Sequence, residues 1–289
     1  MTFAPRSAIV TASDSGIGKA TAVALAEAGM DVGITWHTDE QGAEKTAAEV
    51  REHGRRAEVV RLDTADLAGC GDVIDGLVDR LGGVDVFVNN AGTGSSTLAV
   101  DMPLEEWRHV VATDLDGAFV CLQRAARHMI RAGRGGRLIA VTSVHEHQPR
   151  VGSAAYDAAK HGLGGLMKTL ALELGRHRIT ANCVAPGEIA TPMTGQEDED
   201  PHGKSRPGVP LGRPGDAREI AAVICVSGLA AGVLRHRREL AGGRRHVADG
   251  PAGGLAHPVR RLAFRLRVTA PRPAPCRGGR CALRSARCL

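Results

Sequence analysis

The chain has a single tyrosine, Tyr156, which stands four residues before Lys160. In an α-helix, residues four apart lie on one face, so this spacing places the phenol beside the ammonium. A free phenol titrates near ~10, and a cation within about 4–6 Å favours the phenolate. The pair is therefore predicted to exchange a proton with an alcohol or a ketone near neutral pH. A Y-x-x-x-K match is common, so an ordinary helix that carries both residues by chance is the alternative.

A glycine-rich turn lies near the start of the chain. The apolar run Ala8-Ile9-Val10 leads into Thr11-Ala12-Ser13-Asp14-Ser15-Gly16-Ile17-Gly18, and residues 19–28 then have helical periodicity. A strand, a glycine turn and a helix in this order let backbone N–H groups approach a pyrophosphate at the helix N-terminus. A tight turn without a ligand is the alternative interpretation.

Apolar runs and helical patterns alternate as far as about residue 225. Strands are expected at 8–10, 31–36, 57–62, 84–88, 136–141 and 179–184. Helices are expected at 19–28, 41–53, 67–81 and from 156 to about 174, and a further helix begins at 216. Strands that alternate with helices indicate parallel βαβ units. The predicted fold class is α/β, a Rossmann-type doubly wound parallel sheet.

Five motifs occur in a fixed order between about residue 6 and about residue 225: T-A-S-D-S-G-I-G, N-N-A-G, T-S, Y-D-A-A-K and P-G-E-I-A-T-P-M. Through them the chain resembles the short-chain dehydrogenase/reductase family. The resemblance implies an NAD(P)(H)-dependent oxidoreductase that interconverts a secondary alcohol and its carbonyl by hydride transfer, with a tyrosine as proton donor. A dinucleotide-binding protein that is inactive because of its altered C-terminus is the alternative.

The resemblance also implies a catalytic set of Ser143, Tyr156, Lys160 and Asp114. Ser143 stands thirteen residues before Tyr156, the family's interval, and would bind the substrate oxygen. Lys160 would hold the nicotinamide ribose hydroxyls as well as tune Tyr156. The family more often has asparagine at the position of Asp114, and an ionised aspartate cannot donate a hydrogen bond. Activity is expected to survive, because the family's proton relay uses mainly the backbone carbonyl there.

The cofactor-binding positions follow from the same resemblance. Ala12 replaces the family's usual first glycine, which adds one methyl group where the cofactor approaches closely. Asp63 would contact adenine, while Ile189 and Thr191 would face the nicotinamide. The full predicted set is Thr11, Ser13, Ser15, Gly16, Ile17, Gly18, Asp63, Asn89, Ala91, Gly92, Tyr156, Lys160, Pro186, Gly187, Ile189 and Thr191.

The end of the second predicted strand bears on the choice between NADP(H) and NAD(H). In NAD-specific folds, an acidic residue there usually binds the ribose 2′-hydroxyl. Thr35, Trp36 and His37 include no acid, so a 2′-phosphate is tolerated. NADP(H) is the predicted cofactor and NAD(H) the alternative, with His37 otherwise a solvated loop residue.

Two segments are expected to line the substrate side. His145-Glu146-His147 invites a metal interpretation, but the family's hydride chemistry needs no metal and no third ligand is obvious, so no metal site is predicted. These residues more simply line the pocket and suggest a polar substrate. The segment 194–215, rich in glycine, proline and acids, is expected to form a mobile lid over that substrate.

The composition of the chain indicates its cellular compartment and which kinds of partner to expect. There is no run of about 18 apolar residues and no signal-peptide core, so a cytoplasmic protein without a membrane segment is expected. The seven cysteines have no zinc-like spacing and are expected to be reduced. Of the formal net charge of +5, residues 226–289 contribute +12 from 14 Arg, no Lys and two acids, which leaves −7 for residues 1–225. Nucleic-acid binding by the basic tail is the weaker interpretation.

Residues 226–289 do not match the family and are crowded with Arg, Gly, Ala and Pro. Two regions are therefore expected, a catalytic domain at 1–225 and an aberrant, disordered tail at 226–289. Synonymous codons exist for residues 232–241 that, shifted by one base, give Gly-Tyr-Ser-Val-Thr-Gly-Ala-Ser-Trp, close to the family's last strand. The tail is thus predicted to be translated out of frame, with that strand missing or replaced. Because its neighbourhood forms much of the family's subunit interface, the usual homo-oligomer is affected as well.

Overall fold

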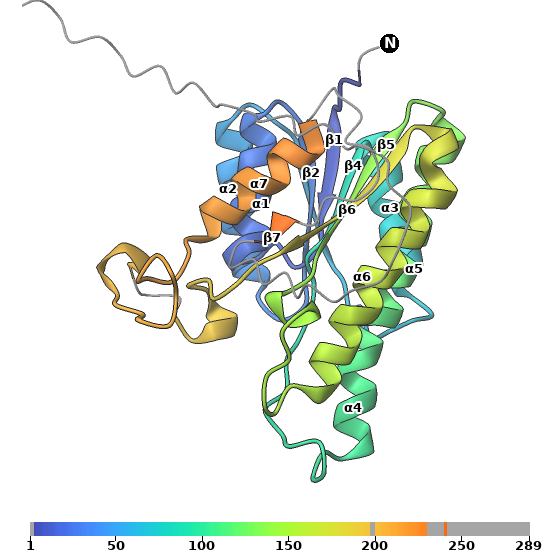
Figure 1. The fold of residues 1–289 in the computed structure, drawn as a ribbon. Coiled ribbons are helices and arrows are strands. Elements are labelled where there is room, and N and C mark those ends of the chain that lie inside the picture. Colours follow the sequence, from blue (N-terminus) through green and yellow to red (C-terminus); the bar gives the residue numbers. More distant parts are fainter. Residues whose placement is uncertain (1–2, 197–199, 230–239, 242–289) are drawn as a thin grey trace, which may run out of the picture. The chain divides into compact units, whose positions relative to one another are not determined.

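Seven parallel strands form one sheet in the computed structural model, which describes residues 3–196, 200–229 and 240–241 (Figure 1). The strand order is β3-β2-β1-β4-β5-β6-β7. The strands are β1 (Ser7–Val10), β2 (Asp31–Trp36), β3 (Ala57–Arg61), β4 (Val86–Asn89), β5 (Gly136–Val141), β6 (Ile179–Ala185) and β7 (Leu240–Ala241). The order reverses between β1 and β4, and in sheets of this kind ligands bind beyond the carboxyl ends of the strands at such a reversal.

Helices cover both faces of the sheet. Figure 1 shows α1, α2 and α7 on one face and α3, α5 and α6 on the other. The helices are α1 (Gly16–Glu27), α2 (Glu40–Glu52), α3 (Cys70–Leu81), α4 (Leu104–Val111), α5 (Gly117–Ala132), α6 (Ala154–Leu174) and α7 (Ala217–Leu229). The predicted doubly wound α/β fold is confirmed.

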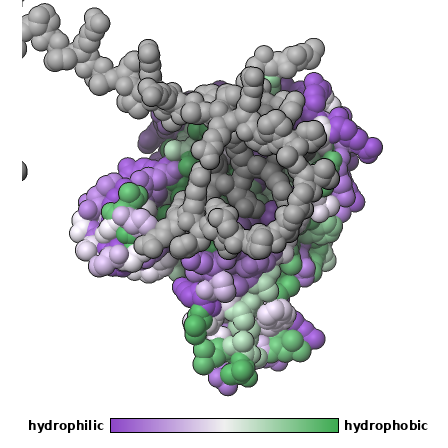
Figure 2. Space-filling view, viewed as in Figure 1, coloured by the Kyte–Doolittle hydropathy of each residue, from purple (hydrophilic) through white to green (hydrophobic). Residues whose placement is uncertain are grey.

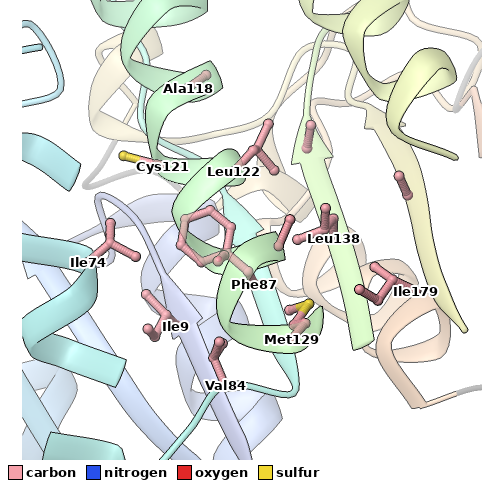
Figure 3. Packing of buried hydrophobic residues seen from close by; sticks show 14 of the residues in the cluster. Ile9, Ile74, Val84, Phe87, Ala118, Cys121, Leu122, Met129, Leu138 and Ile179 are labelled. Atoms are coloured by element: carbon pink, nitrogen blue, oxygen red, sulfur yellow. The ribbon is translucent and has the colours of Figure 1, made fainter. Parts of the chain in front are cut away.

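The core has two layers because both faces of the sheet are buried. Ile9 and Phe87 point toward α3 and α5, where Leu122 and Met129 pack against them (Figure 3). Their neighbours along the strands, such as Val10 and Val88, belong to the cluster on the other face. Alternate residues of one strand thus enter different layers, which is why these strands are continuous apolar runs in the sequence.

Helix α3 begins at Cys70, three residues later than the periodicity predicts. The carboxylate of Asp63 accepts a hydrogen bond from Ala65 N at 2.9 Å, and that of Asp66 accepts one from Gly69 N at 3.1 Å. Such aspartate side chains stabilise turns in competition with helix. Leu67 therefore belongs to the turns before the helix.

A π-helical turn, η1 (Ala112–Asp116), separates α4 from α5. Within it, Asp114 is fully buried and accepts a hydrogen bond from Thr93 N at 2.7 Å. Directly after it, Gly117 lies against the backbone of Thr64. Single π-helical turns inside helices often mark functional positions, and this one turns a carboxylate inward.

Gly117→Ala is expected to destabilise the protein by about 1–3 kcal/mol. A Cβ at this position would overlap the carbonyl oxygen of Thr64 and lie 2.8 Å from its carbonyl carbon. Gly76→Ala is the matched control, because a Cβ there meets nothing within 4 Å and should stabilise α3 by about 0.5–1 kcal/mol. Urea unfolding of both variants measures the difference, and equal effects of the same sign would contradict the packing at Gly117.

The last strand of the described sheet consists of two residues, Leu240 and Ala241, which pair in parallel with Val184 and Ala185 of β6. Helix α7 continues to Leu229 and so crosses the predicted boundary at residue 225. The predictions of a frame change and of disorder concern residues that otherwise lie outside the described part of the chain. The division into 1–225 and 226–289 stays a prediction.

Two features of the described residues bear on environment. None of the helices there is both long enough and apolar enough to cross a membrane. Cys70, Cys121 and Cys183 are buried and Cys225 is partly buried, and none of the four forms a disulfide. The other three cysteines lie outside the described residues.

Candidate active site

The glycine turn after β1 is held by side chains that the sequence predicts to bind the cofactor. Thr11 Oγ1 accepts hydrogen bonds from Asn90 N at 2.9 Å and Ala91 N at 2.8 Å. Ser13 Oγ donates to Val10 O and accepts from Thr35 N. Both side chains are fully buried. Their contribution to a ligand site therefore comes through the backbone of the turn.

Helix α1 presents its N-terminus at this turn. Ser15 is the N-cap residue and its side chain makes no capping hydrogen bond, so it leaves the first amides of the helix uncapped. A Cβ at Gly18 would overlap the carbonyl oxygen of Ala12 and lie 2.7 Å from Asn90 Nδ2. Ile17 packs beside the core. Free amides and missing side chains fit the pyrophosphate of a dinucleotide.

Ala12 adopts φ +48°, and Gly16 adopts φ +52°. Left-handed backbone is costly for a residue with a Cβ, by about 1 kcal/mol or more, which explains why glycine suits the position of Ala12. Asn90 Nδ2 donates to the carbonyl oxygens of Thr11 and Ala12 and holds the turn in this conformation. The sequence motif N-N-A-G thus contributes a positioning side chain, Asn90, that was absent from the predicted set.

The end of β2 differs in detail from the prediction. Thr35 is buried and its Oγ1 accepts a hydrogen bond from Ala12 N at 3.0 Å, so it supports the turn. His37 is exposed, and its Nε2 lies 3.5 Å from Asp63 Oδ2. Burial raises the pKa of Asp14, the charge of Asp39 raises it further, and backbone hydrogen bonding and His37 oppose the rise. Of the three residues at the end of β2, His37 thus lies beside Asp63, the residue predicted to contact adenine.

The turn after β4 brings the first and second halves of the sheet together. Asn89 is buried, and both polar atoms of its side chain lack a hydrogen-bond partner among the described residues. Ala91 is also buried. A Cβ at Gly92 would lie 2.9 Å from Asp114 Oδ2 and 3.1 Å from Lys160 Nζ. The absence of a side chain at Gly92 leaves room for these two charged groups.

Lys160 and Tyr156 lie on one face of α6, as predicted. Lys160 Nζ is 5.3 Å from the ring centre of Tyr156 and 3.1 Å from Asp114 Oδ2, and it donates to Val141 O at 3.4 Å. Burial lowers the pKa of Lys160, but Asp114 and Tyr156 raise it by more, so this pKa lies above its usual value. The lysine is therefore an ammonium that is almost completely shielded from solvent.

Ser143 follows β5 and caps a short 3-10 turn. Its Oγ accepts a hydrogen bond from His145 N at 3.1 Å, which leaves the hydroxyl hydrogen available to another acceptor. The His145 ring stands edge-on to Tyr156, with ring centres 6.4 Å apart. His145 Nδ1 lies 2.7 Å from Gln148 O. Ser143 and Tyr156 therefore flank the same histidine, which belongs to the segment expected to line the pocket.

The segment after β6 contacts both the Ser143 turn and the glycine turn. Pro186 O accepts a hydrogen bond from Val144 N at 2.8 Å, which joins this segment to the Ser143 turn. Gly187 is exposed, whereas Ile189 and Thr191 are buried. A Cβ at Gly16 would lie 3.2 Å from Thr191 Cγ2. The predicted residues of this segment thus lie across from the glycine turn.

The predicted lid is anchored at Glu188. Arg206 Nε donates to its carboxylate at 2.7 Å, and Gly215 N donates to its carbonyl oxygen at 2.9 Å. The hydrogen bond from Arg206 is the main reason that the pKa of Glu188 is lowered. Motion of the segment 194–215 stays a prediction.

Glu146, from the segment expected to line the pocket, is a further buried acid and is absent from the predicted catalytic and cofactor-binding sets. Its side chain is 3% exposed, one of its oxygens has no hydrogen-bond partner among the described residues, and its charge acts on Lys160. The H-E-H pattern pointed to this segment, but no sequence signal showed that the glutamate turns inward.

Comparison with known proteins gives one family. The family model described as short chain dehydrogenase matches residues 6–202. An uncharacterized oxidoreductase, YohF of Escherichia coli (strain K12), is 54% identical over 217 residues, which are 75% of this chain and 86% of that protein. A 3-oxoacyl-[acyl-carrier-protein] reductase of Synechocystis sp. (strain ATCC 27184 / PCC 6803 / Kazusa) is 38% identical over 75% of this chain and 86% of that protein.

Solved structures agree with these relatives. The acetoin dehydrogenase YohF from Salmonella typhimurium is 52% identical and superposes with a TM-score of 0.74. The match covers 79% of this chain and 89% of that chain. A short chain dehydrogenase from Burkholderia cenocepacia J2315 in complex with NADP is 30% identical, with a TM-score of 0.71. The match covers 79% of this chain and 93% of that chain.

Proposed function

Because this chain belongs to the short-chain dehydrogenase family, we propose that it is an NADP(H)-dependent oxidoreductase that interconverts a secondary alcohol and its carbonyl. The observation that carries the proposal is the buried Lys160 5.3 Å from the ring centre of Tyr156, with Ser143 hydrogen-bonded to the His145 that borders that ring. A proton donor, a cation and a hydroxyl at one end of a parallel sheet suit chemistry on a carbonyl oxygen.

The proposed roles follow from these contacts. The nicotinamide, when bound, supplies or accepts the hydride. Ser143 donates its free hydroxyl hydrogen to the substrate oxygen, because its Oγ already accepts from His145 N. Tyr156 gives a proton to that oxygen in reduction and takes it back in oxidation. Lys160 holds positive charge beside the phenol and would hold the ribose hydroxyls of the cofactor.

The remaining predicted positions are proposed to bind the cofactor. The turn from Thr11 to Gly18, with α1, would hold the pyrophosphate, and Asp63 the adenine. Asn89, Ala91 and Gly92 would line the adjoining wall, where the unpartnered polar atoms of Asn89 suit a polar ligand. Pro186, Gly187, Ile189 and Thr191 would enclose the nicotinamide from the opposite side.

The substrate is proposed to be a small vicinal hydroxyketone or diketone. Support comes from two solved relatives whose names state acetoin dehydrogenase, from Salmonella typhimurium and Enterobacter cloacae, both 52% identical. In this chain the half-buried His145 borders Tyr156 and offers a polar contact to a second oxygen.

A substrate panel tests the proposal. The full chain is incubated with NADPH and diacetyl, acetoin, simple ketones or a β-ketoester, and loss of NADPH absorbance is followed. Turnover with the dicarbonyl or hydroxyketone above that with simple ketones is expected. NADPH binding without turnover on any carbonyl would favour the alternative, a non-catalytic dinucleotide-binding protein.

His37→Asp is expected to weaken NADPH binding about tenfold or more while leaving NADH binding unchanged or improved. The new carboxylate would repel a 2′-phosphate and accept a hydrogen bond from a 2′-hydroxyl. His53→Asp is the control, because His53 is also exposed but follows the far end of α2. Calorimetric affinities for both cofactors measure the effect, and an unchanged NADPH to NADH ratio would contradict it.

The chain is also proposed to assemble with copies of itself. Figure 2 shows apolar surface at the tip of the molecule around α4. Exposed large apolar side chains there include Leu98, Val100, Leu104 and Trp107. Monomeric proteins seldom expose large apolar patches without a partner. Light scattering of the purified chain gives its assembly state.

A further inference from the structure

Asp114 is held against Lys160 from two sides. It is fully buried, its Oδ2 lies 3.1 Å from Lys160 Nζ, and its Oδ1 accepts a hydrogen bond from Thr93 N at 2.7 Å. The π-helical turn η1 directs it inward, and Gly92 leaves the space that the pair fills. Asp114 therefore places a buried carboxylate directly beside the ammonium of Lys160.

The charged groups on α6 and on the elements packed against it do not offset this carboxylate. From η2 (Val144–Glu146), the buried Glu146 adds a second acid and His145 borders the Tyr156 ring. On α6 itself, Asp157 is buried and accepts a hydrogen bond from Arg150 N. From α4, Glu106 is engaged with Thr97 Oγ1 at 2.8 Å. Lys160 is therefore the one ammonium among several acids in the described part of this site.

Charge balance then decides how easily Tyr156 ionises. With aspartate at 114, the Asp114–Lys160 pair is neutral, so loss of the phenol proton adds an uncompensated negative charge to a buried site. With asparagine, one of the two buried acids beside the ammonium would be gone and Glu146 would remain, so the same loss would add less uncompensated negative charge. Buried sites strongly penalise net charge, so the two cases differ in a known direction.

We propose that Asp114 is the counter-ion of Lys160 that opposes ionisation of Tyr156, so that alcohol oxidation, which needs the phenolate, rises at a higher pH than it would with an uncharged side chain at position 114. The statement about alcohol oxidation rests on the proposed function. In reduction, the carbonyl carbon accepts a hydride from the reduced nicotinamide and the carbonyl oxygen accepts the Tyr156 proton. The substrate gains two electrons and two hydrogens, and the phenolate regains its proton from solvent. Oxidation needs the phenolate first.

The single tyrosine makes the test direct, because phenolate absorbance in the near ultraviolet reports Tyr156 alone. The parent chain, Asp114→Asn and Asp116→Asn are titrated without cofactor. Asp116 lies on the same turn but is exposed, so its variant removes equal charge without touching Lys160. The Asp114→Asn midpoint is expected about 1 to 2 pH units below that of the parent, with Asp116→Asn unchanged.

The rate profiles supply a second reading. The pH at which alcohol oxidation rises should move down by the same interval in Asp114→Asn, and the reduction rate should fall at correspondingly lower pH. A midpoint in Asp114→Asn equal to or above that of the parent would overturn the proposal. A lowered midpoint without turnover on any substrate would keep the counter-ion and reject the proposed function.

Folding is checked by circular dichroism at each pH. If Asp114→Asn fails to fold, Glu146→Gln takes its place, because Glu146 acts on the same lysine without the bond to Thr93. It should lower the midpoint in the same direction by a smaller amount. A Tyr156 titration midpoint that is unchanged or raised in Glu146→Gln would then overturn the proposal.

Discussion

Tyr156→Phe is expected to lower kcat by about 10²- to 10⁴-fold while the Kd for NADPH stays nearly unchanged. The substitution removes only the transferable proton, and a positioned general acid contributes about that much to rate. Lys160 stays charged and in place, because its contacts to Asp114 and Val141 do not involve the phenol. Steady-state kinetics and a binding titration measure the two quantities separately.

Thr169→Val is the control for this variant. Thr169 is exposed on the same helix, and within the described residues its hydroxyl bonds only to Gly165 O, at 3.4 Å. Removal of a hydroxyl from α6 as such should leave kcat unchanged. More than a few per cent of parental activity in Tyr156→Phe would mean that another group gives the proton.

Gly18→Ala is expected to reduce NADPH affinity about 100-fold or more and to lower stability by about 1–3 kcal/mol. The added methyl group would overlap the carbonyl oxygen of Ala12 and press on Asn90 Nδ2. Because Asn90 holds the turn through Thr11 and Ala12, the start of α1 must shift away from the pyrophosphate position. Calorimetry and thermal unfolding record both effects.

Gly165→Ala is the matched control, since a Cβ on that exposed position of α6 meets nothing within 4 Å. It should bind NADPH like the parent and be slightly more stable. Parental NADPH affinity in Gly18→Ala would show that the turn does not hold the cofactor.

The sequence predicts the sheet well because its central strands are buried on both faces: every residue of β1 and of β4 is buried, and both strands are largely apolar. Strand β5 spans residues 136–141, as predicted, and the helix of Tyr156 ends at Leu174. The start of α3 and the π-helical turn are missed, because side-chain hydrogen bonds of Asp66 and Asp114 determine them. Apolar periodicity contains no information about such bonds.

In the candidate site, too, the sequence predicts local spacing but not contacts between distant side chains. The spacing of Tyr156 and Lys160 follows from helical geometry, which the sequence states directly. The contact between Asp114 and Lys160 arises only when two distant segments meet at one edge of the sheet. Likewise, Thr35 looks like a ligand-facing strand end, but its hydroxyl turns back to Ala12 N. Which way a polar side chain points depends on partners that pattern alone does not identify.

Transfer of deuterium from NADPH to substrate tests the proposed reaction most directly. The full chain is given diacetyl with NADPH deuterated on either face of nicotinamide C4, and the alcohol product is analysed by mass spectrometry. Deuterium on the new carbinol carbon from one face and not the other is predicted, with Tyr156→Phe forming almost no product. A chain that binds NADPH but transfers deuterium to none of the carbonyl compounds tested would contradict the assignment as an oxidoreductase.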